Sequence, residues 1–120
     1  MKNIIQTILL LGFTILYLTP AQAQSAKKNI VKESFAVTGV CGMCEKRIEK
    51  AALIKGVISV AWDKDAQQVN VIYKSKKTSL EEIKTAIAAV GHDTEGLAAP
   101  DSAYAELPQC CAYREGVEVH

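Results

Sequence analysis

The chain is organised around one short segment, Thr38-Gly39-Val40-Cys41-Gly42-Met43-Cys44, in which two residues separate a pair of cysteines. Just before it, residues 32–38 alternate between apolar and polar side chains, which predicts a half-buried strand. Just after it, residues 44–55 repeat apolar side chains at helical spacing and cover the other face with charge. The segment is therefore expected to join a strand to a helix, with Cys41 in the loop and Cys44 in the first turn of the helix.

The rest of the pattern predicts a hairpin and a second helix. Residues 57–62 and 69–73 are rich in β-branched and aromatic side chains and flank a polar turn, as in a hairpin. Ser79 is a good N-cap, and Glu82 three residues later completes a capping-box pattern, which predicts a helix from Ser79 to Val90.

Residues 92–97 leave room for only a short closing strand. The expected order is then strand, helix, strand, strand, helix, strand. This is the order of the ferredoxin-like α+β fold, βαββαβ, with an antiparallel sheet and two helices on one face. The predicted domain covers residues 30–97.

Residues 1–23 have the layout of a secretory signal peptide. Lys2 gives a positive start, residues 4–18 are almost entirely apolar, and Ala21-Gln22-Ala23 suits a peptidase that cuts before Gln24. The apolar run is shorter than the roughly 20 residues that span a bilayer, so we expect cleavage and no membrane insertion afterwards. The expected location is periplasmic or secreted.

The mature chain is expected to be neutral. The full chain has 14 Lys and Arg against 13 Asp and Glu, and residues 1–23 contain Lys2 but no acidic residue. Nucleic acid and anionic lipid both need a basic surface, so neither is expected as a partner.

All four cysteines, Cys41, Cys44, Cys110 and Cys111, lie in the predicted mature chain. Small disulfide scaffolds usually space cysteines so that each bond closes a long loop, which these spacings do not allow. A bond between the adjacent Cys110 and Cys111 would also be strained, because neighbouring Cα atoms lie about 3.8 Å apart and disulfides usually want about 4.4–6.8 Å. Metal binding or redox chemistry is therefore favoured.

A position at the start of a helix favours thiolate chemistry at Cys44. Unpaired backbone N–H groups and the positive end of the helix dipole stabilise anionic sulfur there, and Lys46 and Arg47 add positive charge. Thiolates select soft or borderline ions such as Cu(I) or zinc, and two of them would leave an open, exposed site. Structural zinc sites are instead closed by four ligands. We therefore expect Cys41 and Cys44 to bind an ion for transfer.

From Ile30 to Leu97 the chain resembles the heavy-metal-associated (HMA) domain of copper chaperones, metal-pumping ATPases and the periplasmic mercury-binding protein. The resemblance rests on four segments: Thr38–Cys44, Glu45–Ala51, Gly56-Val57 and Ile87–His92. It implies that Cys41 and Cys44 are the metal ligands. The family usually has a methionine two positions before the first cysteine, where this chain has Gly39, and this departure bears on how the loop packs.

His92 is a further candidate ligand, because in the family the loop after the second helix lies beside the metal. A neutral imidazole suits copper and zinc and titrates near physiological pH, so His92 is a third ligand, a proton-dependent gate or a solvated loop residue. Met43 is a soft thioether, but a methionine beside such a loop more often serves packing.

Residues 98–120 form a C-terminal tail outside the resemblance. Residues 98–102 have the composition of a linker, and residues 107–114 include Cys110 and Cys111. Three roles remain open: the tail folds back so that Cys110 or Cys111 adds sulfur to the first site, it forms an independent binding site, or it is a disordered end whose thiols oxidise.

Two other classes of function are compatible with the CxxC pattern. Thioredoxin-like oxidoreductases also place it between a strand and a helix, but they typically have a tryptophan before the first cysteine and a downstream cis-proline. Here Val40 precedes Cys41, and no proline occurs between Pro20 and Pro100. The other class is an interaction module with a Cys41–Cys44 disulfide. No hydrolytic constellation is present, so we expect no enzyme activity.

The sequence thus predicts a carrier that binds a soft metal ion on Cys41 and Cys44. Cu(I) is the first expectation, with Hg(II) and Zn(II) as alternatives. Because open coordination positions let a partner's cysteines attack the bound ion, the expected partner is a membrane metal transporter or efflux component.

Overall fold

The computed structural model describes residues 29–116 and residue 119. The predicted signal peptide and its cleavage position before Gln24 lie outside the described residues. Within the described part of the chain, no helix is both long enough and apolar enough to cross a membrane.

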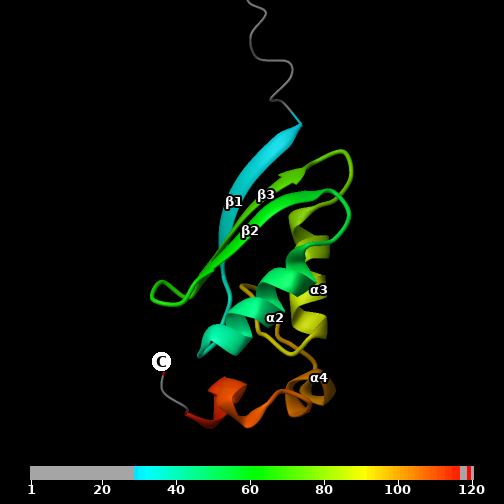
Figure 1. The fold of residues 1–120 in the computed structure, drawn as a ribbon. Coiled ribbons are helices and arrows are strands. Elements are labelled where there is room, and N and C mark those ends of the chain that lie inside the picture. Colours follow the sequence, from blue (N-terminus) through cyan, green and yellow to red (C-terminus); the bar gives the residue numbers. More distant parts are fainter. Residues whose placement is uncertain (1–28, 117–118, 120) are drawn as a thin grey trace, which may run out of the picture.

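Three strands form an antiparallel sheet in the order β1-β3-β2 (Figure 1). They are β1 (Ile30–Ala36), β2 (Val57–Asp63) and β3 (Gln68–Lys74). Val71 of the central strand pairs with Glu33 on one side and with Val60 on the other. The hairpin predicted from the two β-rich segments is therefore confirmed as β2 and β3.

Two helices, α2 (Gly42–Ala52) and α3 (Leu80–Ala89), pack on one face of this sheet and contact each other (Figure 1). The predicted capping box is present: Ser79 Oγ accepts the N–H of Glu82, and the Glu82 side chain accepts the N–H of Ser79. Helix α2 begins earlier than predicted, because Cys41 already serves as its N-cap with an extended backbone.

The core lies between the helices and the inner face of the sheet. Its fully buried members come from both layers: Phe35, Val69 and Val71 from strands, and Ile48, Ile83 and Ile87 from helices. Every second strand residue points to the opposite face, where side chains such as Ser34 and Asn70 are exposed. The expected two-layer α+β, ferredoxin-like arrangement is confirmed.

The predicted closing strand at residues 92–97 is reduced to isolated bridges, in which Thr94 pairs with Val37 and with Leu97. Thr94 and Leu97 exchange two backbone hydrogen bonds of 2.9 and 3.0 Å across a tight turn. Gly96 occupies that turn with a φ of +78°, a conformation that glycine adopts without strain. The turn reverses the chain after a single pairing, so the sheet has three strands among the residues described.

The C-terminal tail packs against the domain. It forms α4 (Asp101–Ala105) and two short 3-10 helices, η1 (Gln109–Cys111) and η2 (Tyr113–Glu115). The tail lies at the end of the molecule where α2 begins, and η1 contacts α2 (Figure 1). The possibility of a disordered end is therefore wrong for the described part of the tail, because Cys111 is buried against the domain.

Candidate metal centre

The CxxC loop is fixed at its start by the hairpin turn and by Trp62. The backbone N–H of Gly39 donates to Gln67 Oε1 at 3.0 Å, and Trp62 Nε1 donates to the carbonyl of Val37 at 3.0 Å. A Cβ atom on Gly39 would lie 2.8 Å from the Trp62 ring. The indole thus occupies the space beside Gly39, which explains in packing terms why no larger side chain stands there.

Three cysteine sulfurs converge at the start of α2. Cys44 Sγ lies 2.7 Å from Cys111 Sγ and 3.9 Å from Cys41 Sγ, and Cys41 Sγ lies 4.0 Å from Cys111 Sγ. All three are free thiols. Cys41, Cys44 and Cys111 are therefore close enough to bind one metal ion together, and we refer to them as the three-sulfur group.

This group is not the open, exposed site that two ligands alone predict. Cys41 is 7% exposed, and Cys44 and Cys111 are 0% exposed. The expectation of an uncovered pair is wrong because η1 lies against the start of α2 and adds Cys111 over the CxxC loop. Of the alternatives for the tail, the geometry supports the one in which it folds back and adds sulfur.

The sulfurs differ in how readily they ionise. Burial raises the pKa of Cys41, but the backbone N–H groups of Cys44 and Met43 and the neighbouring thiols favour its thiolate more strongly, so the pKa falls to about 7. Burial raises the pKa of Cys111, and the sulfurs of Cys44 and Cys41 beside it raise that pKa further. Arg47 Nη1 lies 3.6 Å from Cys111 Sγ. An ion that binds all three sulfurs must therefore displace the proton of Cys111, and Arg47 is placed to stabilise the resulting thiolate.

Polar contacts hold the tail in this position. The Tyr113 hydroxyl donates to the carbonyl of Gly91 at 2.7 Å and accepts the N–H of Asp93 at 2.9 Å. Arg114 forms ion pairs with Asp93 at 2.7 Å and with Asp101 at 3.0 Å, a set that we call the Arg114 latch. These contacts lie two and three positions after Cys111, so they fix the segment that carries the third sulfur.

The family model of the heavy-metal-associated domain matches residues 34–93, half of the chain. This chain belongs to the HMA family. A search among curated protein sequences gives no significant match.

Solved structures of other proteins have the same fold as this HMA domain. The CopZ metallochaperone is 33% identical, with a TM-score of 0.52 over 54% of this chain and 100% of CopZ. Oxidized MerP from Ralstonia metallidurans CH34 is 25% identical, with a TM-score of 0.52 over 55% of this chain and 94% of MerP. The N-terminal domain of a potential copper-translocating P-type ATPase from Bacillus subtilis is 30% identical, with a TM-score of 0.51 over 53% of this chain and 82% of that domain. Because CopZ is covered completely, almost half of this chain has no counterpart in it.

His92 lies beside the HMA loop but outside the three-sulfur group. It is 0% exposed, its Nδ1 is 2.8 Å from the carbonyl of Thr38, and its ring stacks on Tyr113 with centroids 5.7 Å apart. A carbonyl only accepts, so Nδ1 carries the proton in this contact. Burial lowers the pKa of His92, and the charge of Arg47 lowers it further, which favours the neutral ring. The possibility of a solvated histidine is therefore wrong, and the structure does not bring His92 to the sulfurs as a ligand.

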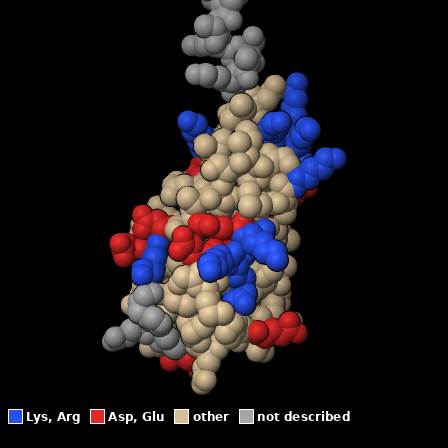
Figure 2. All heavy atoms as spheres, viewed as in Figure 1, with Lys and Arg blue, Asp and Glu red and all other residues tan. Residues whose placement is uncertain are grey.

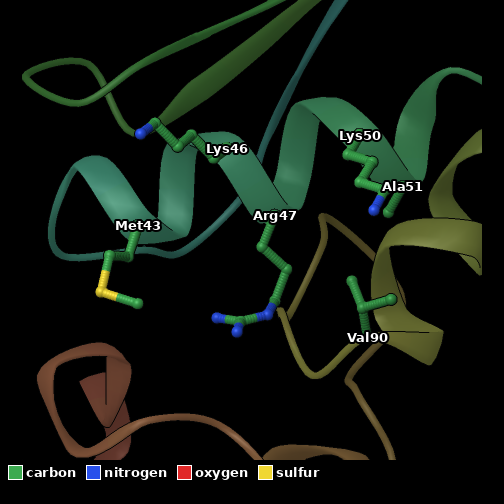
Figure 3. Close-up of a pocket in the computed structure, with 6 residues that line it drawn as sticks. All are labelled: Met43, Lys46, Arg47, Lys50, Ala51 and Val90. Carbon is green, nitrogen blue, oxygen red and sulfur yellow. The ribbon is translucent and has the colours of Figure 1, made fainter.

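Cys110 also lies outside the three-sulfur group, although it is adjacent to Cys111. Its thiol is partly exposed and lies 3.6 Å from Met43 Sδ. Met43 is 53% exposed and lines a surface groove together with Lys46, Arg47, Lys50, Ala51 and Val90. Met43 and Arg47 both point from α2 toward the tail (Figure 3).

The role of Tyr113 and Arg114, which position Cys111, was not predicted from the sequence. Their partners Gly91 and Asp93 are 22 and 21 positions away. The available signal was an aromatic and a basic residue just after the cysteine pair. The neighbouring sequence gives no indication that these two side chains contact the loop after α3.

Proposed function

We propose that this HMA protein carries a soft metal ion on Cys41, Cys44 and Cys111 and transfers it to a membrane metal transporter or efflux component. The observation that carries the proposal is the convergence of three free cysteine sulfurs at the start of a helix. The site residues come from the CxxC loop of the HMA domain and from the tail of the same chain.

Three thiolates favour a soft ion. Sulfur ligands select Cu(I), zinc and similar ions over magnesium and calcium. Closed zinc sites have four ligands, and the described residues offer three cysteine sulfurs and no fourth Cys, His, Asp or Glu ligand in the group. Cu(I) is therefore the first candidate and Hg(II) the second. The structural neighbours support copper as the first candidate, because one is a domain of a potential copper-translocating ATPase in its Cu(I)-loaded state and another is the CopZ metallochaperone.

Transfer by ligand exchange requires that a partner's sulfur reach the ion. The three-sulfur group is buried. Either one sulfur must therefore dissociate from the ion, or the tail must move away, before a partner can bind the ion. HMA domains also occur in P-type ATPases, which supports a transporter as the acceptor. Membership of the HMA family favours this function over the thioredoxin-like oxidoreductase alternative.

Native mass spectrometry of the reduced protein tests the proposal. We expect one Cu(I) or Hg(II) per chain, and Cys41→Ser combined with Cys44→Ser should abolish the stoichiometric complex. Equal loading of the double variant would contradict the proposal. Dithiol reductase turnover by the wild-type protein would favour the oxidoreductase alternative instead.

We further propose a periplasmic or secreted location, supported by the signal-peptide layout of residues 1–23. Mass measurement of the protein from fractionated cells should give a mature chain that starts at Gln24. A full-length chain retained in the membrane fraction would contradict this location.

A further inference from the structure

The buried three-sulfur group has a second pair of sulfurs beside it, at the surface. Met43 lies between the inner ligands Cys41 and Cys44, and Cys110 directly precedes the inner ligand Cys111. The two side chains come from opposite sides, one from α2 and one from η1, and their sulfurs are 3.6 Å apart. We call Met43 and Cys110 the outer sulfur pair.

The outer sulfur pair lies close to the inner group. The carbonyl oxygen of Cys110 is 3.7 Å from Cys41 Sγ, so the Cys110 backbone touches an inner ligand while its thiol faces Met43. Met43 is 53% exposed, whereas the three inner sulfurs are almost fully buried. Among the described residues, the outer sulfur pair therefore provides the solvent-accessible sulfur atoms next to the buried three-sulfur group.

A thiolate and a thioether are both soft ligands, and a thioether suits Cu(I) in particular. Two such ligands bind an ion more weakly than three thiolates. Weak binding suits a site that the ion occupies transiently during transfer, and not the site where it rests. We therefore expect strong binding inside and weak binding outside, and on each segment an outer ligand is directly adjacent in sequence to an inner one, Met43 to Cys44 and Cys110 to Cys111.

The groove beside the outer sulfur pair is lined by three basic side chains. Lys46, Arg47 and Lys50 line the groove that contains Met43, and basic side chains gather over α2 on the face shown in Figure 2. A basic surface disfavours a free cation but attracts an ion that already has thiolate ligands, since Cu(I) with two thiolates is an anion.

We propose that Met43 and Cys110 form an outer metal-binding pair through which a soft ion passes between a thiolate complex in solution and the three-sulfur group. This inference rests on the proposed function. At each exchange one metal–sulfur bond forms and another breaks. When Cys110 enters, the proton that its thiol loses is taken up by the departing thiolate, whereas the Met43 thioether enters and leaves without a proton. The oxidation state of the ion does not change.

Measured rates and affinities distinguish a transient ligand on the transfer route from a ligand of the resting metal site. Cu(I) affinity would be measured by competition with a chromophoric Cu(I) chelator, and transfer to a small dithiol by stopped-flow absorbance. The variants are Met43→Leu, Cys110→Ser and the two combined. Cys111→Ser, at the adjacent cysteine of the three-sulfur group, is the comparison variant. Because Met43 is largely exposed, Met43→Leu tests the thioether without disturbing the core.

A ligand used only on the route changes uptake and release equally and leaves the affinity almost unchanged. We expect the combined outer variant to slow both directions by about tenfold or more, with Kd within about twofold of wild type. Cys111→Ser should instead weaken Kd by about tenfold or more. Unchanged rates in the outer variants, or a loss of affinity like that of Cys111→Ser, would overturn the proposal. Absence of Cu(I) binding by the wild-type protein would instead refute the proposed function itself.

Discussion

The Trp62 ring packs directly against Gly39 at the start of the CxxC loop and leaves no room for a side chain there. A Cβ atom at Gly39 would lie 2.8 and 2.9 Å from two Trp62 ring carbons, whereas one at Gly42 would meet nothing within 4 Å. Gly39→Ala should therefore lower the free energy of unfolding by about 1–3 kcal/mol, the usual cost of overpacking. Gly42→Ala, as the control, should be neutral or stabilising by less than about 1 kcal/mol. Urea unfolding of the metal-free protein measures both, and equal effects of the two substitutions would contradict this packing.

The Cys41 thiol should ionise near neutral pH in the metal-free protein. Its pKa is lowered to about 7 from the model-compound value of 9.0. The ultraviolet absorbance of the thiolate should therefore show a step centred near pH 7, with the thiolate formed as the pH rises. Cys41→Ser should remove that step, and Cys110→Ser should leave it in place. A titration with no step below pH 8 would show that the N–H groups at the start of α2 do not outweigh burial.

The sequence predicted that Cys41 lies in the loop and that Cys44 lies in the first turn of the helix, because both follow from local patterning. It could not choose between Cys110 and Cys111, since the choice depends on how a short 3-10 helix is oriented against a surface 67 positions earlier in the chain. The same limit applies to His92, whose burial depends on Tyr113 stacking on it from the tail.

The Arg114 latch should make the attachment of the tail depend on pH. Burial raises the pKa of Asp93, but the hydrogen bonds from Arg114 and from the N–H of Ala99 outweigh it, so the pKa is lower than that of an ordinary aspartate. A lowered folded-state pKa means that ionised Asp93 stabilises the folded protein. This contribution is complete above the unfolded-state pKa of about 3.9 and is lost as the pH falls through the lower folded-state pKa.

Asp93→Asn should therefore lower the free energy of unfolding by about 1 kcal/mol at pH 7, and the difference from wild type should shrink below about pH 4. Asp101→Asn is the matched control, because the Asp101 side chain is 100% exposed and contacts the same arginine. Its effect should be near zero at every pH. Thermal unfolding of the metal-free proteins across this pH range gives the comparison, and a constant difference for Asp93→Asn would contradict the latch.

Among the elements, helix α3 was predicted nearly to its ends, because Ser79 and Glu82 form a local capping signal that the structure retains. The closing strand at residues 92–97 was not predicted correctly. Its pairing partner Val37 is distant in sequence, and the tight turn that contains Gly96 reverses the chain before a ladder can extend. The helix in residues 101–105 has no strong periodic pattern, since five residues are too few to show one.

The molecule as a whole combines an HMA domain with a cap from its own tail. The family match ends at residue 93, before the tail begins, and CopZ is matched over its full length by only 54% of this chain. Cys111, Tyr113 and Arg114 therefore all belong to the part of the protein that extends beyond the HMA match, and Tyr113 and Arg114 join it to Gly91 and Asp93 at the end of that match. In this account the HMA domain supplies two ligands, and the tail supplies the third and excludes water.

The number of sulfurs bound to the ion is the quantity on which this account depends. X-ray absorption spectroscopy of the reduced protein loaded with one Cu(I) counts them directly. The account predicts three sulfur ligands in the wild-type protein and two in Cys111→Ser, with Cys110→Ser retaining three. Two sulfurs in the wild-type protein, unchanged by Cys111→Ser, would show that the tail covers the metal without binding it and would contradict the account.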